Sequence, residues 1–75
     1  MDGNAVLAIR LHEGLSQREF AEKIGISPKT LSAIETGKRP VTRHTRTRIA
    51  LHYDVTGDEV QEAIRRAKMS ERLYS

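Results

Sequence analysis

Apolar residues recur along this chain at helical spacing, three or four positions apart, and no stretch alternates as a β-strand would. The apolar members of five successive stretches are Val6, Leu7, Ile9 and Leu11; Phe20, Ala21 and Ile24; Leu31 and Ile34; Ile49, Ala50 and Tyr53; and Val60, Ala63, Ile64 and Ala67. The pattern predicts an all-α fold, a compact bundle of five helices.

Capping residues predict where these helices begin and end. The first helix is predicted over residues 5–13, with Asn4 as its N-cap and Gly14 as the residue that ends it. The second begins after Ser16, which forms the Ser-x-x-Glu capping box with Glu19. The predicted ranges and caps of the helices after the first are 17–24, ending at Gly25; Ser27 to Gly37, with Pro28 in the first turn; Thr42 to about His52; and 57–70, capped by Thr56.

The second and third predicted helices are separated by about three residues, so they must cross at a steep angle. Ala21 leaves room for the crossing helix, and Gly25 allows the positive φ that such a corner often needs. Ile26 then returns to the core, followed by an apolar pair in the third helix. This spacing is typical of a helix-turn-helix over residues 16–36, with an ordinary helical hairpin as the alternative.

Positive charge is concentrated in one short segment. The chain has 13 Lys and Arg against 10 Asp and Glu, a formal charge of +3. Segments 1–37 and 49–75 each carry a net charge of −1, so the excess lies in residues 38–48. The basic residues of that segment are Lys38, Arg39, Arg43, Arg46 and Arg48. Such a run is either a solvated face or a surface for a polyanion, with nucleic acid as the first choice.

The small size and the composition exclude several classes of protein. The 75 residues suffice for one small domain, and we expect residues 1–75 to form it without a separate sensing domain. There is no cysteine, which excludes disulfides and cysteine-based zinc sites and fits a reducing cytosol. No run approaches the roughly 18 apolar residues of a membrane span, and the N-terminus does not look like a secretion signal.

Residues 15–38, LSQREFAEKIGISPKTLSAIETGK, resemble the helix-turn-helix of the Cro and phage-repressor family. The matching residues are Leu15, Ser16, Gln17, Ala21, Gly25, Ile26, Ser27, Leu31, Ser32, Ile34, Glu35, Gly37 and Arg39, with Phe20 in place of the usual leucine. The similarity extends from Arg10 to Val60, whereas Arg46 and His52 depart from the family's usual apolar and small residues. The resemblance implies a lambda-repressor-like DNA-binding domain that binds double-stranded DNA sequence-specifically as a small transcriptional regulator, a repressor in type.

A helix that enters the major groove presents its N-terminal residues to base edges. The expected base contacts are Pro28, Lys29, Thr30, Ser32 and Ala33. Lys29 is the best base reader because an ammonium can donate to guanine O6 and N7; a phosphate contact or a solvated lysine is the alternative. The expected phosphate contacts, including the glutamine that the resemblance implies, are Gln17, Ser27, Lys38, Arg39, Thr42 and Arg43.

The resemblance also implies a partly buried ion pair between Arg10 and Glu35, with two surface charges as the alternative. No nucleophile and base stand at a recognisable spacing, so we expect no enzyme. The three histidines lie on separate predicted elements, so we expect neither a metal nor a cofactor.

The C-terminal part of the chain, residues 55–73, is the expected dimerisation or partner segment. Apolar residues that the motif does not use are Leu7, Leu11, Met69, Leu73 and Tyr74. They either cover one another or form a homodimer seam, since a single module reads only a short half-site. An antitoxin or another protein-interaction module is the alternative function. We expect a cytoplasmic protein without membrane contact, nucleoid-associated when bound to DNA.

Overall fold

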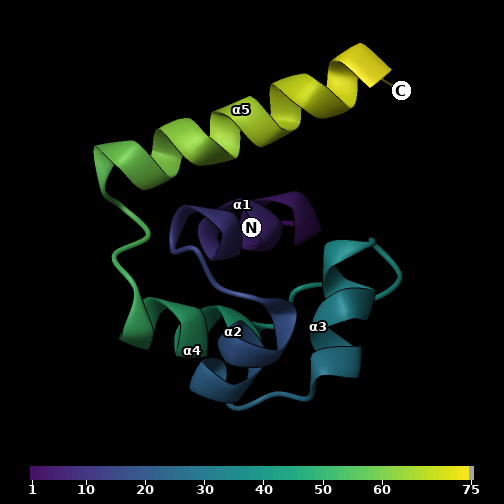
Figure 1. Cartoon of the computed structure of the whole chain (residues 1–75), viewed down its shortest axis with the longest axis vertical. Helices are drawn as coiled ribbons and strands as arrows, with labels where there is room; N and C mark the ends of the chain where they lie inside the picture. Colours follow the sequence, from purple (N-terminus) through teal and green to yellow (C-terminus); the bar gives the residue numbers. More distant parts are fainter. Residues whose placement is uncertain (75) are drawn as a thin grey trace.

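The computed structural model describes the backbone of residues 1–74 and the side chains of residues 1–67 and Met69. Five helices follow one another along this part of the chain, and none of it is a strand (Figure 1). The helices are α1 (Gly3–His12), α2 (Gln17–Ile24), α3 (Pro28–Glu35), α4 (Arg43–His52) and α5 (Asp58–Tyr74). The predicted all-α, five-helix fold is confirmed.

The three predicted caps of the central helices are present. At the start of α2, the Ser16 side chain accepts from the Glu19 N–H at 3.1 Å, and the Ser16 N–H donates to Glu19 Oε1 at 3.0 Å. The hydrogen bond from the Ser16 N–H is the main cause that lowers the pKa of the Glu19 carboxyl, and the hydrogen bond with the Ser16 side chain is the second. Ser27 caps α3 and Thr42 caps α4 by accepting from backbone N–H groups three residues on. These caps fix where each helix begins, as the sequence indicates.

The outer helices differ from their predicted bounds. The N-cap of α1 is Asp2, whose Oδ1 accepts from the Ala5 N–H at 2.9 Å, so the prediction of Asn4 as the cap is wrong. Both residue types favour this position, and the earlier one is used. Helix α5 begins at Asp58 and continues to Tyr74, beyond the predicted residue 70, because no glycine or proline follows to end it.

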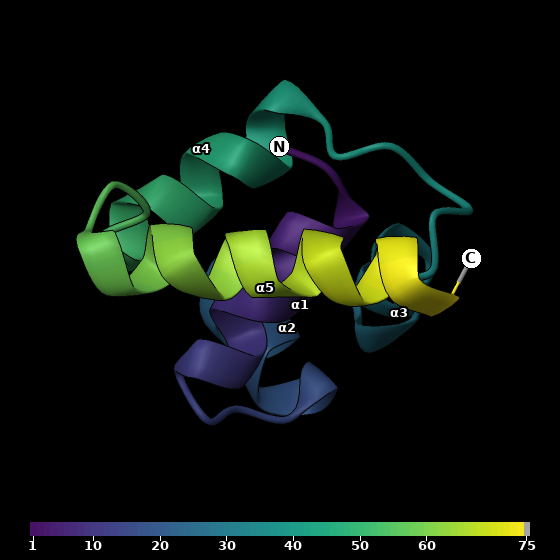
Figure 2. The ribbon, with the colours of Figure 1, turned by 90° about the horizontal axis from the view of Figure 1, so that it is seen from above.

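Helix α1 lies at the centre of the domain, between α5 on one side and the α2–α3 pair on the other (Figure 1). Viewed from above, α5 runs across α1, and α4 lies to one side of it (Figure 2). The buried core cluster consists of Val6, Ile9, Phe20, Ala21, Ile24, Leu31, Ile34, Ile49 and Val60. Helix α4 contributes Ile49 to this cluster, whereas the predicted core residue Ala50 is exposed. Tyr53, which follows α4, stacks on Phe20 with ring centroids 5.3 Å apart.

The start of α1 presses against the end of α3. A Cβ placed on Gly3 would lie 2.1 Å from the Ile34 carbonyl oxygen, which is closer than any real contact. Only glycine allows the two backbones to approach in this way. The C-terminal end of α3 is therefore seated on α1. None of the helices in the described part of the chain has the length and apolar character needed to cross a membrane.

Candidate nucleic-acid interface

Helices α2 and α3 pack against each other across a three-residue turn, Gly25 to Ser27. Gly25 adopts φ +76°, and the Ile26 N–H donates to the Ala21 carbonyl at 3.0 Å, which ends α2. Ala21 is fully buried, as expected for the small residue at the crossing. A three-residue connection with a glycine at positive φ agrees with the corner expected for the helix-turn-helix.

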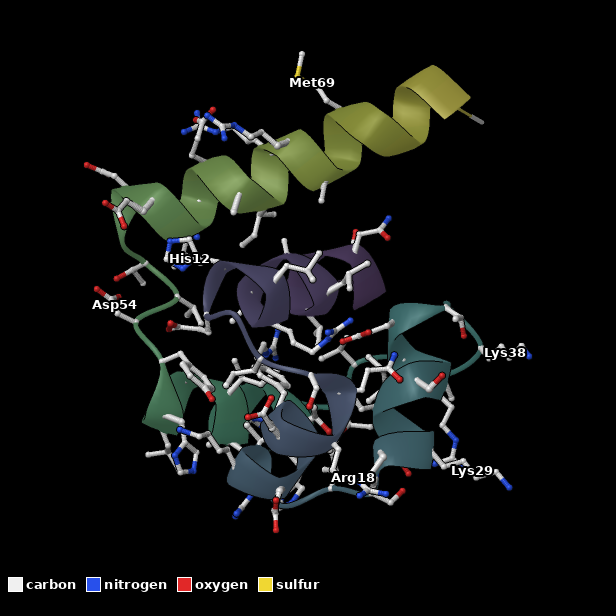
Figure 3. The ribbon with its side chains drawn as sticks, viewed as in Figure 1. His12, Arg18, Lys29, Lys38, Asp54 and Met69 are labelled. Carbon is white, nitrogen blue, oxygen red and sulfur yellow. The ribbon has the colours of Figure 1, made fainter. Side chains whose placement is uncertain are left out.

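Helix α3 has one anchored side and one accessible side. Its buried residues are Leu31, Ile34 and Glu35. The predicted base-contacting residues lie on the other side: Pro28 and Lys29 are exposed, and Thr30, Ser32 and Ala33 are half-buried. Lys29 extends away from the domain near the start of α3 (Figure 3). None of these five residues is buried, and Pro28 and Lys29 are the most accessible of them.

Two hydroxyl groups at the start of α3 are engaged within the cap. The Ser27 hydroxyl donates to Thr30 Oγ1 at 2.9 Å while it accepts from the Thr30 N–H at 3.0 Å. The bond between the two hydroxyls uses one of their two hydrogens. The other hydroxyl hydrogen remains as a donor toward a phosphate or a base edge.

The loop between α3 and α4 folds back on α3. The Lys38 and Arg39 N–H groups donate to the Ala33 carbonyl at 2.9 and 3.1 Å, while both side chains are exposed. Lys38 extends outward from this loop (Figure 3). Arg43 is exposed in the first turn of α4, where the Thr42 hydroxyl is engaged with Thr45. Three exposed cations therefore follow α3 directly.

A buried carboxylate links α1, α2 and α3. Arg10 donates from Nε to Glu35 Oε2 at 2.8 Å and from Nη2 to Glu35 Oε1 at 3.0 Å, a bidentate pair. The exposed fractions of the two side chains are 13% and 3%. Arg10 Nη1 also donates to the Leu15 carbonyl at 3.0 Å. The end of α3 is thereby tied to α1 and to the loop that leads into α2.

Gln17 completes this network by donating from Nε2 to Glu35 Oε1 at 2.9 Å. The predicted phosphate-contacting glutamine therefore braces α3 in the free protein. One hydrogen of its amide and the amide oxygen are not used by that bond. A phosphate contact by Gln17 and the brace to Glu35 are compatible.

Two arginines have places in the structure that the expected contacts did not include. Arg18 is exposed in the first turn of α2 and, with Glu22, Ile26 and Pro28, lines a shallow groove. It lies at the same end of the molecule as Lys29 (Figure 3). Arg48 belongs to the basic segment 38–48 but is half-buried, and its Nε donates to the Ile24 carbonyl. The solvent-facing cations of that segment are Lys38, Arg39, Arg43 and Arg46.

Two capped helices joined by a tight glycine turn, with the second anchored on one side only, define a helix-turn-helix domain. The model of the helix-turn-helix family HTH_3 matches residues 6–60, so the chain belongs to this family, and the resemblance noted in the sequence is confirmed. This is a family of DNA-binding domains and not of enzymes. No curated protein sequence and no solved structure shows a significant match to the chain.

Proposed function

We propose that this DNA-binding domain is a sequence-specific transcriptional regulator that represses by occupying a promoter. The observation that carries the proposal is that one end of α3 is anchored in the domain while the other end is accessible. Its C-terminal half is held by Glu35 and by the contact with Gly3, while Lys29 and its neighbours remain accessible. A helix presented in this way can enter the major groove with its N-terminal residues first.

Base reading would rest on a few side chains of α3. The Lys29 ammonium can donate to the O6 and N7 acceptors of guanine. The hydroxyls of Thr30 and Ser32 can bond to several bases, so they discriminate weakly, whereas Ala33 can contact a thymine methyl. Pro28 adds apolar contact only. Lys29 is accordingly the residue on which a preferred base pair depends.

Phosphate contacts would position α3 in the groove. Lys38, Arg39 and Arg43 supply charge beside α3, and the N-termini of α2 and α4 present N–H groups that favour phosphate. Arg18 adds a fourth cation from the first turn of α2. The surface charge near α3 is therefore broader than the basic segment alone.

The test of this proposal is selection of bound sites from random duplexes with the wild-type chain and with Lys29→Ala. We expect the wild type to select a defined site and Lys29→Ala to lose preference at one base pair, a cost of about 1–3 kcal/mol in discrimination. Thr36→Ala, an exposed change at the C-cap of α3, serves as a control for altered α3 stability. An unselective wild type would favour the protein-interaction module instead.

Dimerisation would let the protein read two half-sites. A groove between α1 and α5 is lined mainly by Asn4, Leu7, Ala8, Leu11, Ala63 and Ala67. Leu11 and Met69 are 61% and 65% exposed, so the domain leaves apolar surface uncovered near the expected 55–73 segment. The side chains of Leu73 and Tyr74 lie outside the described residues.

Sedimentation of the free protein and of its complex with a selected duplex tests the dimer. We expect two copies per duplex, and we expect Leu11→Ser to weaken the second binding event more than the first. The exposed Leu51 of α4 provides the matched control, Leu51→Ser, because it lies outside the groove. One copy per site at saturating protein would leave the groove to a different protein partner, as in an antitoxin.

A further inference from the structure

A side chain from α4 holds the corner of the helix-turn-helix. Arg48 Nε donates to the carbonyl of Ile24, the last residue of α2. Its guanidinium also lies over Gly25: a Cβ on that glycine would be 2.6 Å from Arg48 Nη2 and 3.0 Å from Cζ. Gly25 is therefore needed for its positive φ, and a side chain at this position would also displace the Arg48 guanidinium.

The contact satisfies a group that helix geometry leaves open. The last four carbonyls of a helix have no partner within it, and Ile24 contributes one of these in α2. The Ala21 carbonyl is satisfied by the Gly25 and Ile26 N–H groups, but the Ile24 carbonyl receives its donor from α4. A guanidinium at this position also places positive charge at the negative end of α2.

We propose that Arg48 is a positioning residue for DNA reading, which fixes the angle at which α3 leaves the corner. The proposal rests on the proposed function, because it assumes that α3 reads bases. Arg48 sits on the same helix as Arg43, one of the expected phosphate contacts. Arg48 therefore fixes the position of the start of α3, which reads bases, relative to the start of α4, which binds phosphate.

Loss of the Arg48 contact should reduce the protein's preference for its own site more than its general affinity for DNA. A hydrogen bond to a base edge is made only when donor and acceptor lie within a few tenths of an ångström of their ideal separation. Long lysine and arginine side chains can reach a phosphate over a wider range of positions. If the corner were free to shift, the contacts to base edges would weaken, whereas the contacts to phosphates would remain. Because Arg48 is half-buried and its Nε is bonded within the protein, we expect it to add no phosphate contact of its own.

The test compares Arg48→Met, Arg48→Lys and the control Arg46→Met, which removes the same charge from an exposed position two residues earlier. We expect Arg48→Met to lower the affinity ratio of a selected duplex over a scrambled one about tenfold, with the slope of log affinity against log salt unchanged. Arg48→Lys keeps the charge but not the planar fork, and we expect most of the same loss. Arg46→Met should keep the wild-type ratio.

Amide hydrogen exchange of Ile26 gives a readout independent of DNA, since that N–H closes the corner. We expect faster exchange at Ile26 in both Arg48 variants, relative to amides in α1 of the same variant. Wild-type selectivity in folded Arg48→Lys, or a salt slope in Arg48→Met reduced by about 0.9 as for a lost phosphate contact, would overturn the proposal. A wild type that selects no site would instead overturn the proposed function and leave the exchange result as the test of the corner.

Discussion

Replacing Glu35 with glutamine is expected to lower the free energy of unfolding by about 3–5 kcal/mol. The carboxylate is buried and accepts three hydrogen bonds, two from Arg10 and one from Gln17. A glutamine keeps one acceptor oxygen at this place but removes the negative charge that pairs with the Arg10 guanidinium, whose side chain is 13% exposed. The loss is large because an unpaired charge stays behind, not because the pair itself is strong.

This loss is a large part of the free energy of unfolding expected for the whole domain. A chain of 75 residues is expected to have an unfolding free energy of roughly 4–11 kcal/mol. Glu35→Gln should therefore remove between about a quarter and the whole of this stability. Urea unfolding followed by circular dichroism measures the change directly.

A matched control is Glu22→Gln, which removes an exposed carboxylate from α2. We expect its midpoint to stay near that of the wild type. The double variant Arg10→Met with Glu35→Met separates the value of the pair from the cost of breaking it, and should recover much of the stability. An unchanged midpoint in Glu35→Gln would mean that the network contributes nothing, despite its burial.

Affinity for a selected duplex is expected to fall about 150-fold between 50 and 200 mM salt, if about four phosphates are neutralised at a log–log slope of roughly −3.6. The cations placed to do so are Lys38, Arg39, Arg43 and Arg18. Each phosphate that the protein neutralises releases condensed counterions into solution, so the slope counts contacts more reliably than affinity alone.

Alanine variants of these four residues test the assignment one contact at a time. Each should reduce the slope by about 0.9 in fluorescence anisotropy titrations. Lys23→Ala, an exposed lysine in the last turn of α2, should leave the slope in place. A wild-type slope near zero would remove the electrostatic basis of the interface, whatever the affinity.

The central part of the fold is predictable because its signals are local. Ser16 with Glu19, Ser27 before Pro28, and Thr42 each mark a helix start within three residues of chain. The start of α1 is not decided locally, because Asp2 and Asn4 are equally good caps. The end of α5 is missed for a related reason: nothing in the sequence stops it.

The candidate interface is less predictable because contacts distant in sequence assign its residues. Arg48 counts as one more cation in a basic run until its bond to Ile24, 24 residues earlier, is known. Gly3 carries no local signal, since its role is the approach of two backbones. Arg18 could have been found from its place at the start of α2, beside Gln17, where an exposed cation accompanies the helix N-terminus.

The two sides of α3 place different demands on the sequence as it diverges. Leu31, Ile34 and Glu35 are held by the core and by the buried ion pair, so exchange there is opposed by stability. Lys29 and Ser32 are not among the buried residues of α3, and the described contacts of their side chains do not hold the fold together. Under the proposed function, descendants of this gene could acquire new operators by exchanging these accessible residues while keeping the same scaffold. A library randomised at those positions would therefore remain largely folded.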